Sequence, residues 1–92
     1  MEDEDEEEGV KASLLPRFYK EVWLDGQNKF HRLNGPAIIF EDGSKSWLRH
    51  GKLHCDDGPA RILKDYEEWW KDGEPYEPTA HEIMVWKMKK KL

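Results

Sequence analysis

The 92-residue chain holds little that could brace a fold covalently or carry it across a membrane. Cys55 is the single cysteine, which excludes an internal disulfide and fits a reducing compartment. No apolar run approaches the roughly 20 residues that a spanning helix needs, and the acidic start is the opposite of a signal peptide. With 37% hydrophobic and 38% charged residues, such a small domain can build only a limited core. These shortages predict one soluble, cytoplasmic domain.

Charge is distributed unevenly along the chain. The formal net charge is -5, yet Glu2 to Glu8 supplies seven acids without a break, which leaves 13 acidic against 15 basic residues elsewhere. A like-charge run repels itself and has nothing apolar to bury. Residues 1–9 are therefore predicted to be a disordered acidic tail. A solubilising tail is the simplest interpretation, and an acidic arm that binds a basic surface stays open as an alternative.

The middle of the chain contains two copies of one sequence repeat and the beginning of a third. W-L-D-G-Q-N-K-F-H-R-L-N-G-P-A runs from Trp23 to Ala37, and W-L-R-H-G-K-L-H-C-D-D-G-P-A runs from Trp47 to Ala60. A period in the low twenties is typical of stacked, identical supersecondary units. The third copy begins at Trp70 as W-K-D-G and stops. The matching positions, 23 residues apart, are His31 with His54, Gly35 with Gly58, Pro36 with Pro59, and Trp47 with Trp70.

Within each copy, turn signals separate short runs that favour strands. Arg17–Leu24 is rich in aromatic and β-branched residues, and D-G and N-G-P segments supply the turns. The predicted fold is mainly β: an antiparallel meander of about two and a half hairpin repeats over residues 10–78, which starts with one helical turn at Val10–Leu15 and is capped by a C-terminal helix. The remaining predicted strands are Phe30–Leu33, Ala37–Glu41, Ser46–Arg49, Leu53–Cys55 and Ala60–Lys64.

Comparing the copies predicts which face of the sheet is buried. Ala37 and Ile39 match Ala60 and Ile62, whereas Ile38 matches Arg61. Because side chains alternate across a strand, the Ala/Ile face is predicted to form the core. Trp23, Trp47 and Trp70 share one register and are predicted to stack along the meander.

Residues 79–92 change to a helical pattern. Thr79 and Glu82 fit a capping box, and lysines in the last turn suit the negative end of the helix dipole. We expect this amphipathic helix to cover an open sheet edge. Its predicted packing stripe is Met84, Val85, Met88 and Leu92, which leaves Trp86 on the other flank.

The spacing W-x-x-G, H-R and (N/D)-G-P-A resembles the MORN-type repeat. It is closer still to the W…G…H-R-x-D-G-P-A repeats of small phage and bacterial proteins, which are related to the YwqK-type antitoxin-like repeats. The resemblance covers roughly residues 22–73, with Cys55 standing where the first copy has Arg32. It implies a meandering sheet of hairpins, a phage origin, and a binding or scaffolding role without catalysis.

The histidines and Cys55 do not form a pattern that predicts chemistry. His54 and Cys55 are adjacent, without the C-x-x-C or H-x-x-x-H spacing of a zinc site, and nothing suggests the orienting third group that a cysteine nucleophile needs. His31 and His54 hold the same place in successive repeats. A structural role is therefore predicted, with one ring nitrogen bonded to the turn backbone beside a Trp. No catalytic residue, metal or cofactor is expected.

The leading functional hypothesis is a small non-enzymatic protein that binds a protein partner through exposed aromatic residues. Three alternatives stay open: an inhibitor or antitoxin that uses the acidic tail against an enzyme, a self-assembling structural module, and a homodimer. Nucleic acid is disfavoured by the nearly neutral body, and a membrane surface by the shortness of the helix. The residues predicted to bind the partner are Trp69, Trp86 and Arg61, supported by Lys87, Lys89 and Lys90.

Overall fold

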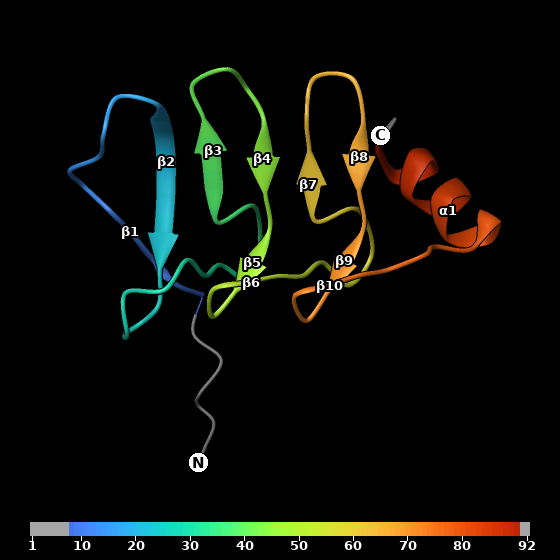
Figure 1. The fold of residues 1–92 in the computed structure, drawn as a ribbon, viewed down its shortest axis with the longest axis horizontal. Coiled ribbons are helices and arrows are strands. Elements are labelled where there is room, and N and C mark those ends of the chain that lie inside the picture. The colour runs from blue at the N-terminus through green and yellow to red at the C-terminus, as the bar shows by residue number, and fades with distance from the viewer. Residues whose placement is uncertain (1–7, 91–92) are drawn as a thin grey trace, which may run out of the picture.

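The computed structural model describes residues 8–90 and shows a mainly β chain closed by one helix (Figure 1). A six-stranded antiparallel sheet has the order β1-β2-β3-β4-β7-β8, and two smaller hairpins, β5-β6 and β9-β10, follow β4 and β8. The predicted fold class is confirmed. The elements are β1 Val10–Lys11, β2 Tyr19–Leu24, β3 Ile38–Phe40, β4 Lys45–Ser46, β5 Leu48–Arg49, β6 Lys52–Leu53, β7 Arg61–Ile62, β8 Glu67–Glu68, β9 Trp70–Lys71, β10 Glu74–Pro75 and α1 Ala80–Lys90.

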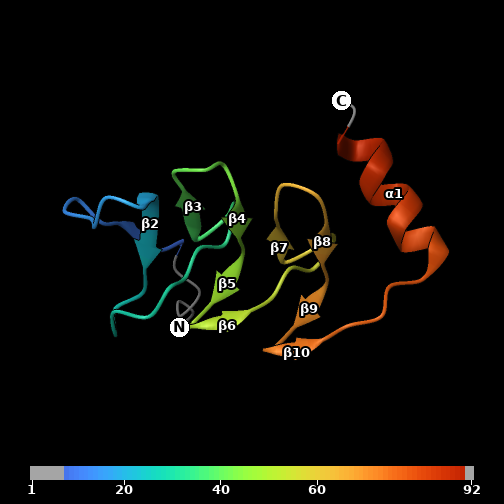
Figure 2. The same ribbon diagram turned by 45° about the horizontal axis from the view of Figure 1, so that its top comes forward.

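The two small hairpins, β5-β6 and β9-β10, lie at an angle to the six-stranded sheet. Figure 2 shows both of them projecting from the row of sheet strands toward the same side. Their turns are His50-Gly51, with φ of 48° and 85°, and Asp72-Gly73, with φ of 52° and 82°. Two consecutive positive φ values are the signature of the type I′ turn, whose twist matches the flanking strands.

The first copy makes the corresponding hairpin with a longer loop. Only one bridge, Leu24 to Phe30, pairs its two arms, so the strand predicted at Phe30–Leu33 is reduced to that contact. Three residues separate Asp25 from Lys29, and Asn28 takes the positive φ of 63°. Gly26 is the first residue of this three-residue loop, whereas Gly51 is the last residue of its two-residue turn, so the two glycines are not structural counterparts and Trp23 lies closer to its glycine than Trp47 does.

The helical turn predicted at Val10–Leu15 is wrong. Val10 and Lys11 pair with Leu24 and Trp23 as β1, and the N–H of Ala12 donates to Val22 O at 2.8 Å. One isolated helical turn pays the full cost of nucleation, whereas pairing satisfies the backbone groups on the outer edge of β2. The folded body also begins earlier than predicted, because Glu8 and Gly9 belong to it. Residues 1–7 of the predicted tail lie outside the described residues.

The core joins the first strands to the β5-β6 hairpin. Val22, Ala37, Ile38 and Leu48 form one buried cluster. The prediction that Ile39 rather than Ile38 faces the core is wrong, since Ile38 is 6% exposed and Ile39 is half-buried. Ala37 precedes β3, so strand alternation does not run through it. Ile38 instead lies between Val22 and Ser46 on the neighbouring strands.

The third copy is shifted by one residue relative to the sequence match. Ser46 O accepts the N–H of Ala37, and Glu68 O accepts the N–H of Ala60, both at 2.9 Å. Glu68 is thus the structural counterpart of Ser46, and Trp69, not Trp70, is the counterpart of Trp47. The cause is the loop after β7, which is one residue shorter than the loop after β3.

Candidate functional site

Each repeat histidine binds the turn of the following repeat. His31 is fully buried, and its Nδ1 accepts a hydrogen bond from the backbone N–H of His50 at 3.0 Å. His54 Nδ1 accepts the N–H of Asp72 at the same distance. His50 and Asp72 are the first residues of the two type I′ turns. The expected bond from a ring nitrogen to a turn backbone is therefore present, but it joins two copies rather than lying within one.

Backbone hydrogen bonds complete these junctions. The N–H of Gly51 donates to Phe30 O at 2.8 Å, and the N–H of Gly73 donates to Leu53 O at 2.9 Å. In the third copy Tyr76 stands where His31 and His54 stand in the others, since its N–H donates to Trp69 O at 2.9 Å. Its hydroxyl bonds the carboxylate of Glu82 in α1, at 2.8 and 3.0 Å. The junction site of the last copy is thus occupied by the helix.

Asp25 fixes the first loop and reaches across to the second turn. Its carboxylate accepts the N–H groups of Lys29 and Gln27, and lies 2.6 Å from His50 Nδ1. The bond from Lys29, followed by that from His50, lowers the pKa of Asp25 to about 2. Charge-assisted bonds of this kind favour the ionised carboxylate.

Asp25 is expected to make the stability of the protein acid-dependent. Its pKa is lowered on folding, so its contribution is complete above the ordinary value near 3.8 and is lost as the pH falls toward 2. We expect Asp25→Asn to flatten the decline in unfolding free energy between pH 4 and pH 2, measured by urea denaturation at each pH. Asp65→Asn is the control and should leave the slope as it is. An unchanged slope in Asp25→Asn would contradict the assignment.

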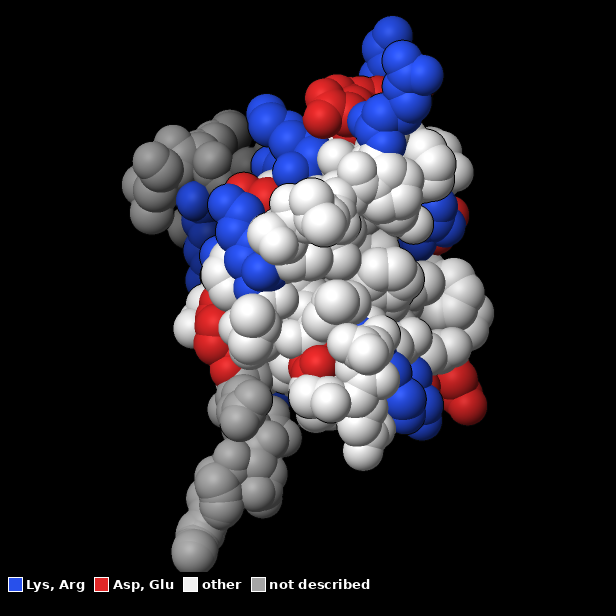
Figure 3. All heavy atoms as spheres, turned by 90° about the vertical axis from the view of Figure 1, so that its left-hand side faces the viewer, with Lys and Arg blue, Asp and Glu red and all other residues white. Residues whose placement is uncertain are grey.

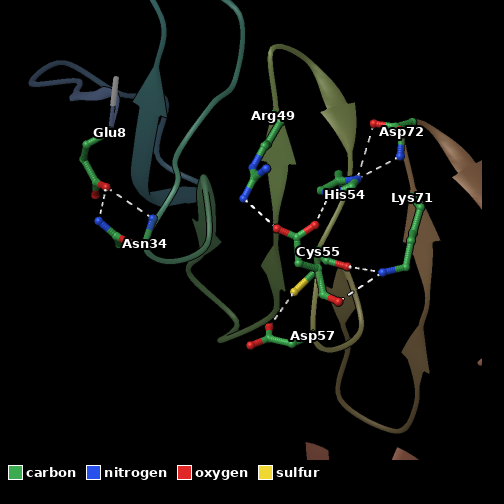
Figure 4. Close-up of polar contacts among 9 residues, drawn as sticks. Glu8, Asn34, Arg49, His54, Cys55, Asp57, Lys71 and Asp72 are labelled. Atoms are coloured by element: carbon green, nitrogen blue, oxygen red, sulfur yellow. Dashed lines mark hydrogen bonds and ion pairs between the residues drawn. The ribbon is translucent and has the colours of Figure 1, made fainter. Parts of the chain in front are cut away.

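The N-G-P-A segment of the first copy is held by Arg32. The Arg32 guanidinium lies 4.0 Å from the centre of the Trp23 ring, and a Cβ on Gly35 would come within 2.9 Å of it. Arg32 also bonds Pro36 O at 3.4 Å and pairs with Glu8 at 3.1 Å. Figure 4 shows Glu8 reaching Asn34 as well. A side chain at position 35 would therefore require the Arg32 guanidinium, the end of a flexible side chain, to move.

In the second copy the helix supplies what Arg32 supplies in the first. Cys55 replaces Arg32, and the Trp86 indole covers Gly58, where a Cβ would meet it at 2.9 Å. Lys71 Nζ donates to the carbonyls of Cys55 and Asp56 (Figure 4). Pro59, the counterpart of Pro36, is fully buried. The space beside the glycine that Arg32 fills in the first copy is therefore filled by Trp86 of α1 in the second.

Trp23, Trp47 and Trp70 do not stack on one another in the described part of the chain. Trp23 packs against Arg32, and the indole N–H groups of Trp23 and Trp70 bond Glu21 and Glu68, both at 3.1 Å. The stacking prediction is wrong, and the rings of Trp23 and Trp70 lie beside charged neighbours instead.

A polar cavity of about 340 Å³ separates the loops of the two copies. Among its lining residues, His54 has both ring nitrogens occupied, by the Asp72 N–H and by Asp56 at 2.7 Å (Figure 4). Burial raises the pKa of the Cys55 thiol, which opposes formation of the reactive thiolate. The thiol form of Cys55 is therefore favoured in this cavity. Residues 8–90 contain no group of three or more side chains suited to a metal ion.

The helix packs with the flank opposite to the one predicted. Trp86 meets Trp69 edge to face, with ring centres 6.3 Å apart, whereas Met84 and Met88 are 54% and 62% exposed. The prediction that Met84 and Met88 pack against the sheet is wrong, because the indole buries more apolar area than a methionine can and Gly58 leaves room for it. Val85, which was also in the predicted stripe, is partly buried, and Leu92 lies outside the described residues. The predicted capping box is confirmed: the Thr79 N–H donates to the Glu82 carboxylate at 2.8 Å, and the Glu82 N–H donates to the Thr79 hydroxyl at 3.1 Å.

The residues predicted to bind a partner lie around this end of the array, but several are already engaged. Trp69 and Trp86 contact each other, Arg61 pairs with Glu68 at 2.8 Å, and Lys89 pairs with Asp57 at 3.4 Å. Lys87 is exposed, and Lys90 is the last residue of α1. Their binding role remains a prediction.

Exposed apolar side chains mark surfaces that the sequence did not single out. At the N-terminal end, Val10, Leu14 and Phe18 are 68%, 91% and 57% exposed. At the other end, Met84 and Met88 are exposed on α1. Both methionines belong to the predicted packing stripe of the helix. They were not predicted to form a surface because that stripe was expected to face the sheet.

Comparison with protein-family models, curated proteins and solved structures finds no match. Among the described residues, no helix has both the length and the apolar character to span a membrane.

Proposed function

We propose that the protein is a non-enzymatic protein-binding module that uses the outer face of α1. The observation that carries this proposal is the exposure of Met84 and Met88, one turn apart on a helix that the other flank ties to the sheet. Methionine is flexible and polarisable, and it is common at protein-binding surfaces. Lys87 lies on the same outer face and adds a positive charge.

The mounting of the helix supports the proposal. Trp86 seats on Gly58 and Trp69, and Glu82 bonds Tyr76. A helix held at two points along its length, Glu82 and Trp86, presents its outer side chains in a fixed arrangement, which lowers the entropy cost of binding. This surface replaces Trp69 and Trp86 as the expected contact, because those rings anchor the helix. A reducing, cytoplasmic location is part of the proposal, since Cys55 is a free thiol.

The test is capture of a partner from lysate of the native cells with two matched variants. Met84→Ser/Met88→Ser should reduce recovery of the partner about tenfold or more, since each buried methionine contributes roughly 1.5 kcal/mol or more. Tyr66→Ser removes an equally exposed apolar side chain from the β7-β8 loop, where Tyr66 is 52% exposed, and should have no effect. Equal recovery with wild type and the methionine variant would overturn the proposal.

A further inference from the structure

We propose that the polar cavity between the first two copies binds an aromatic residue of another protein. The ring of that residue contacts Trp47, and a backbone carbonyl beside the ring accepts a hydrogen bond from Arg49. This site is separate from the outer face of α1, so the inference goes beyond the proposed function. It is drawn from an uncovered tryptophan, from an equivalent groove that α1 already fills, and from the hydrogen-bonding groups that line the cavity.

Trp47 lacks the cover that its counterparts have. The structurally equivalent tryptophans of the three copies are Trp23, Trp47 and Trp69. Trp23 has the Arg32 guanidinium 4.0 Å from its ring centre, and Trp69 contacts two aromatic rings at 6.3 and 6.5 Å. Within residues 8–90, the Trp47 ring has no aromatic or cationic contact, and its indole N–H has no acceptor. A partly buried indole normally finds a partner, so Trp47 is open to an incoming ring and acceptor.

The cavity is the counterpart of the groove in which α1 sits. Its lining includes Gly35 and Trp47, and one copy later the same two places are held by Gly58 and Trp69. In that second groove Trp86 of α1 lies on both residues. The first groove keeps an open volume of about 340 Å³, near the lower end of the range for ligand cavities, about 300–1,000 Å³. By this equivalence, its occupant is an aromatic side chain carried by a polypeptide.

The room over Trp47 comes from the residue at position 55. In the first copy the equivalent residue is Arg32, which covers Trp23. Cys55 lines the cavity, and its side chain is too short to cover a tryptophan ring in the same way. A ring that enters from another protein supplies the cover that the second copy lacks.

The charges around the cavity balance, which favours an uncharged ligand. Figure 3 shows the same balance on the N-terminal end of the array, where acidic and basic side chains lie beside one another rather than in separate patches. A nucleic acid, which needs a surplus of basic groups, is therefore not the expected ligand. The described charged side chains at the cavity are paired with one another: Arg32 with Glu8 and Glu21, Arg49 and His54 with Asp56, and Lys89 with Asp57.

The hydrogen-bonding groups of the cavity favour an acceptor on the ligand. Each carboxylate oxygen of Asp56 and Asp57 already lies beside a donor. The Arg49 guanidinium donates one hydrogen bond within residues 8–90, to Asp56, and has further N–H groups to offer. The carbonyl oxygens on either side of a residue in a peptide are uncharged acceptors, so they match both the free donors and the balanced charge.

The deciding experiment follows the indole N–H signals of the isotope-labelled protein by NMR during addition of N-acetyltryptophanamide. This probe is uncharged and carries an aromatic ring between two carbonyl groups. We expect the Trp47 signal, assigned by its loss in Trp47→Phe, to move in a saturable way with Kd on the order of a millimolar. The Trp23 signal should stay in place. N-acetylleucinamide, which has the same carbonyls without the ring, should bind about tenfold more weakly.

Two further measurements locate the probe in the cavity. Arg49→Gln should weaken probe binding about fivefold because it removes a charged donor, and Arg17→Gln, which changes an exposed arginine away from the cavity, should leave it unchanged. In the wild type, alkylation of the single cysteine, Cys55, by iodoacetamide should slow about twofold at a probe concentration equal to Kd, since half of the sites are then occupied. Alkylation needs no variant and so does not depend on how a substitution affects folding.

Four outcomes would overturn the inference. An immobile Trp47 signal would mean that the cavity holds only water, and equal binding of the leucine probe would mean that the ring is not recognised. Movement of the Trp47 signal with protein concentration alone would assign the cavity to a second copy of the chain. A tryptophan flanked by glycines in a blocked pentapeptide should bind at least as tightly as the probe. If that peptide fails to bind while the probe binds, the ligand is a free small molecule rather than a protein.

Discussion

His31→Ala is expected to lower the free energy of unfolding by about 3 kcal/mol. The imidazole is fully buried and stacks on the His50 ring with 4.0 Å between centres. Truncation leaves a cavity and also leaves the N–H of His50 without its acceptor, and the two costs add. For a domain of this size the midpoint of thermal unfolding should fall by about 15 °C. Urea denaturation followed by circular dichroism measures the change.

The control for His31 is His81, a histidine that lies on α1 rather than at a contact between two copies of the repeat. His81→Ala on exposed α1 should change the unfolding free energy by less than about 0.5 kcal/mol. His54→Ala should cost less than His31→Ala, because the His54 side chain keeps 12% exposure and its turn is nearer solvent. If His31→Ala and His81→Ala were equally mild, the junction would not hold the array together.

Trp86→Ala is expected to release α1 from the sheet and to lower the unfolding free energy by about 2–3 kcal/mol. The value lies below the usual cost of a core Trp truncation because the indole is only half-buried. The lost contacts are those with Trp69 and with the Cα of Gly58. Hydrogen exchange should rise sharply over residues 80–90 and change little in β2 and β3, which pack in the core cluster.

Two variants sharpen this result. Met84→Ala lies on the outer face of the same helix and should be close to neutral, which controls for helix propensity. Gly58→Ala pushes a Cβ to within 2.9 Å of the indole, so it should destabilise the wild type but have almost no effect when Trp86 is already Ala. Additive effects of the two changes would mean that Trp86 does not seat on Gly58.

The repeat could be predicted from the sequence because its turns and its buried small residues recur at fixed spacing. Gly58, Pro59 and Ala60 are buried together, and the type I′ turns coincide with H-G and D-G. The helix and its capping box were predicted for the same reason: local hydrogen bonds depend on residues three apart. The hydrogen bonds between copies could not be predicted from the sequence. A backbone N–H requires no particular residue type at its position, so nothing marks it as the partner of a histidine in the preceding copy.

The register of the third copy was mispredicted because two tryptophans are adjacent in the sequence. Trp69 and Trp70 both satisfy the repeat, and the sequence match favours Trp70, yet the shorter loop after β7 gives the position to Trp69. Trp70 moves into the small hairpin opposite Pro75. Single-residue changes in loop length of this kind shift every following side chain to the other face.

The helix face was mispredicted because hydrophobic periodicity finds a stripe but not its direction. Met84 and Met88 form the more regular stripe, but the seat that Gly58 leaves open fits an indole. The sequence did contain one indication, because Cys55 stands where the first copy has Arg32, so Gly58 cannot be covered as Gly35 is. That Arg32 covers Gly35 became known only from the structure.

The sharing of each histidine with the following turn defines how such a chain can lengthen in evolution. A tandem duplication of residues 50–71 would bring a new H-G turn within reach of the existing His54, and the duplicated histidine would receive the N–H of Asp72. The insertion of 22 residues would leave both the acidic beginning and the Tyr76–Glu82 closure in place. Growth by unequal crossing-over therefore preserves the histidine junctions, whereas the new inner copy would carry Cys55 without the Trp86 indole that covers Gly58.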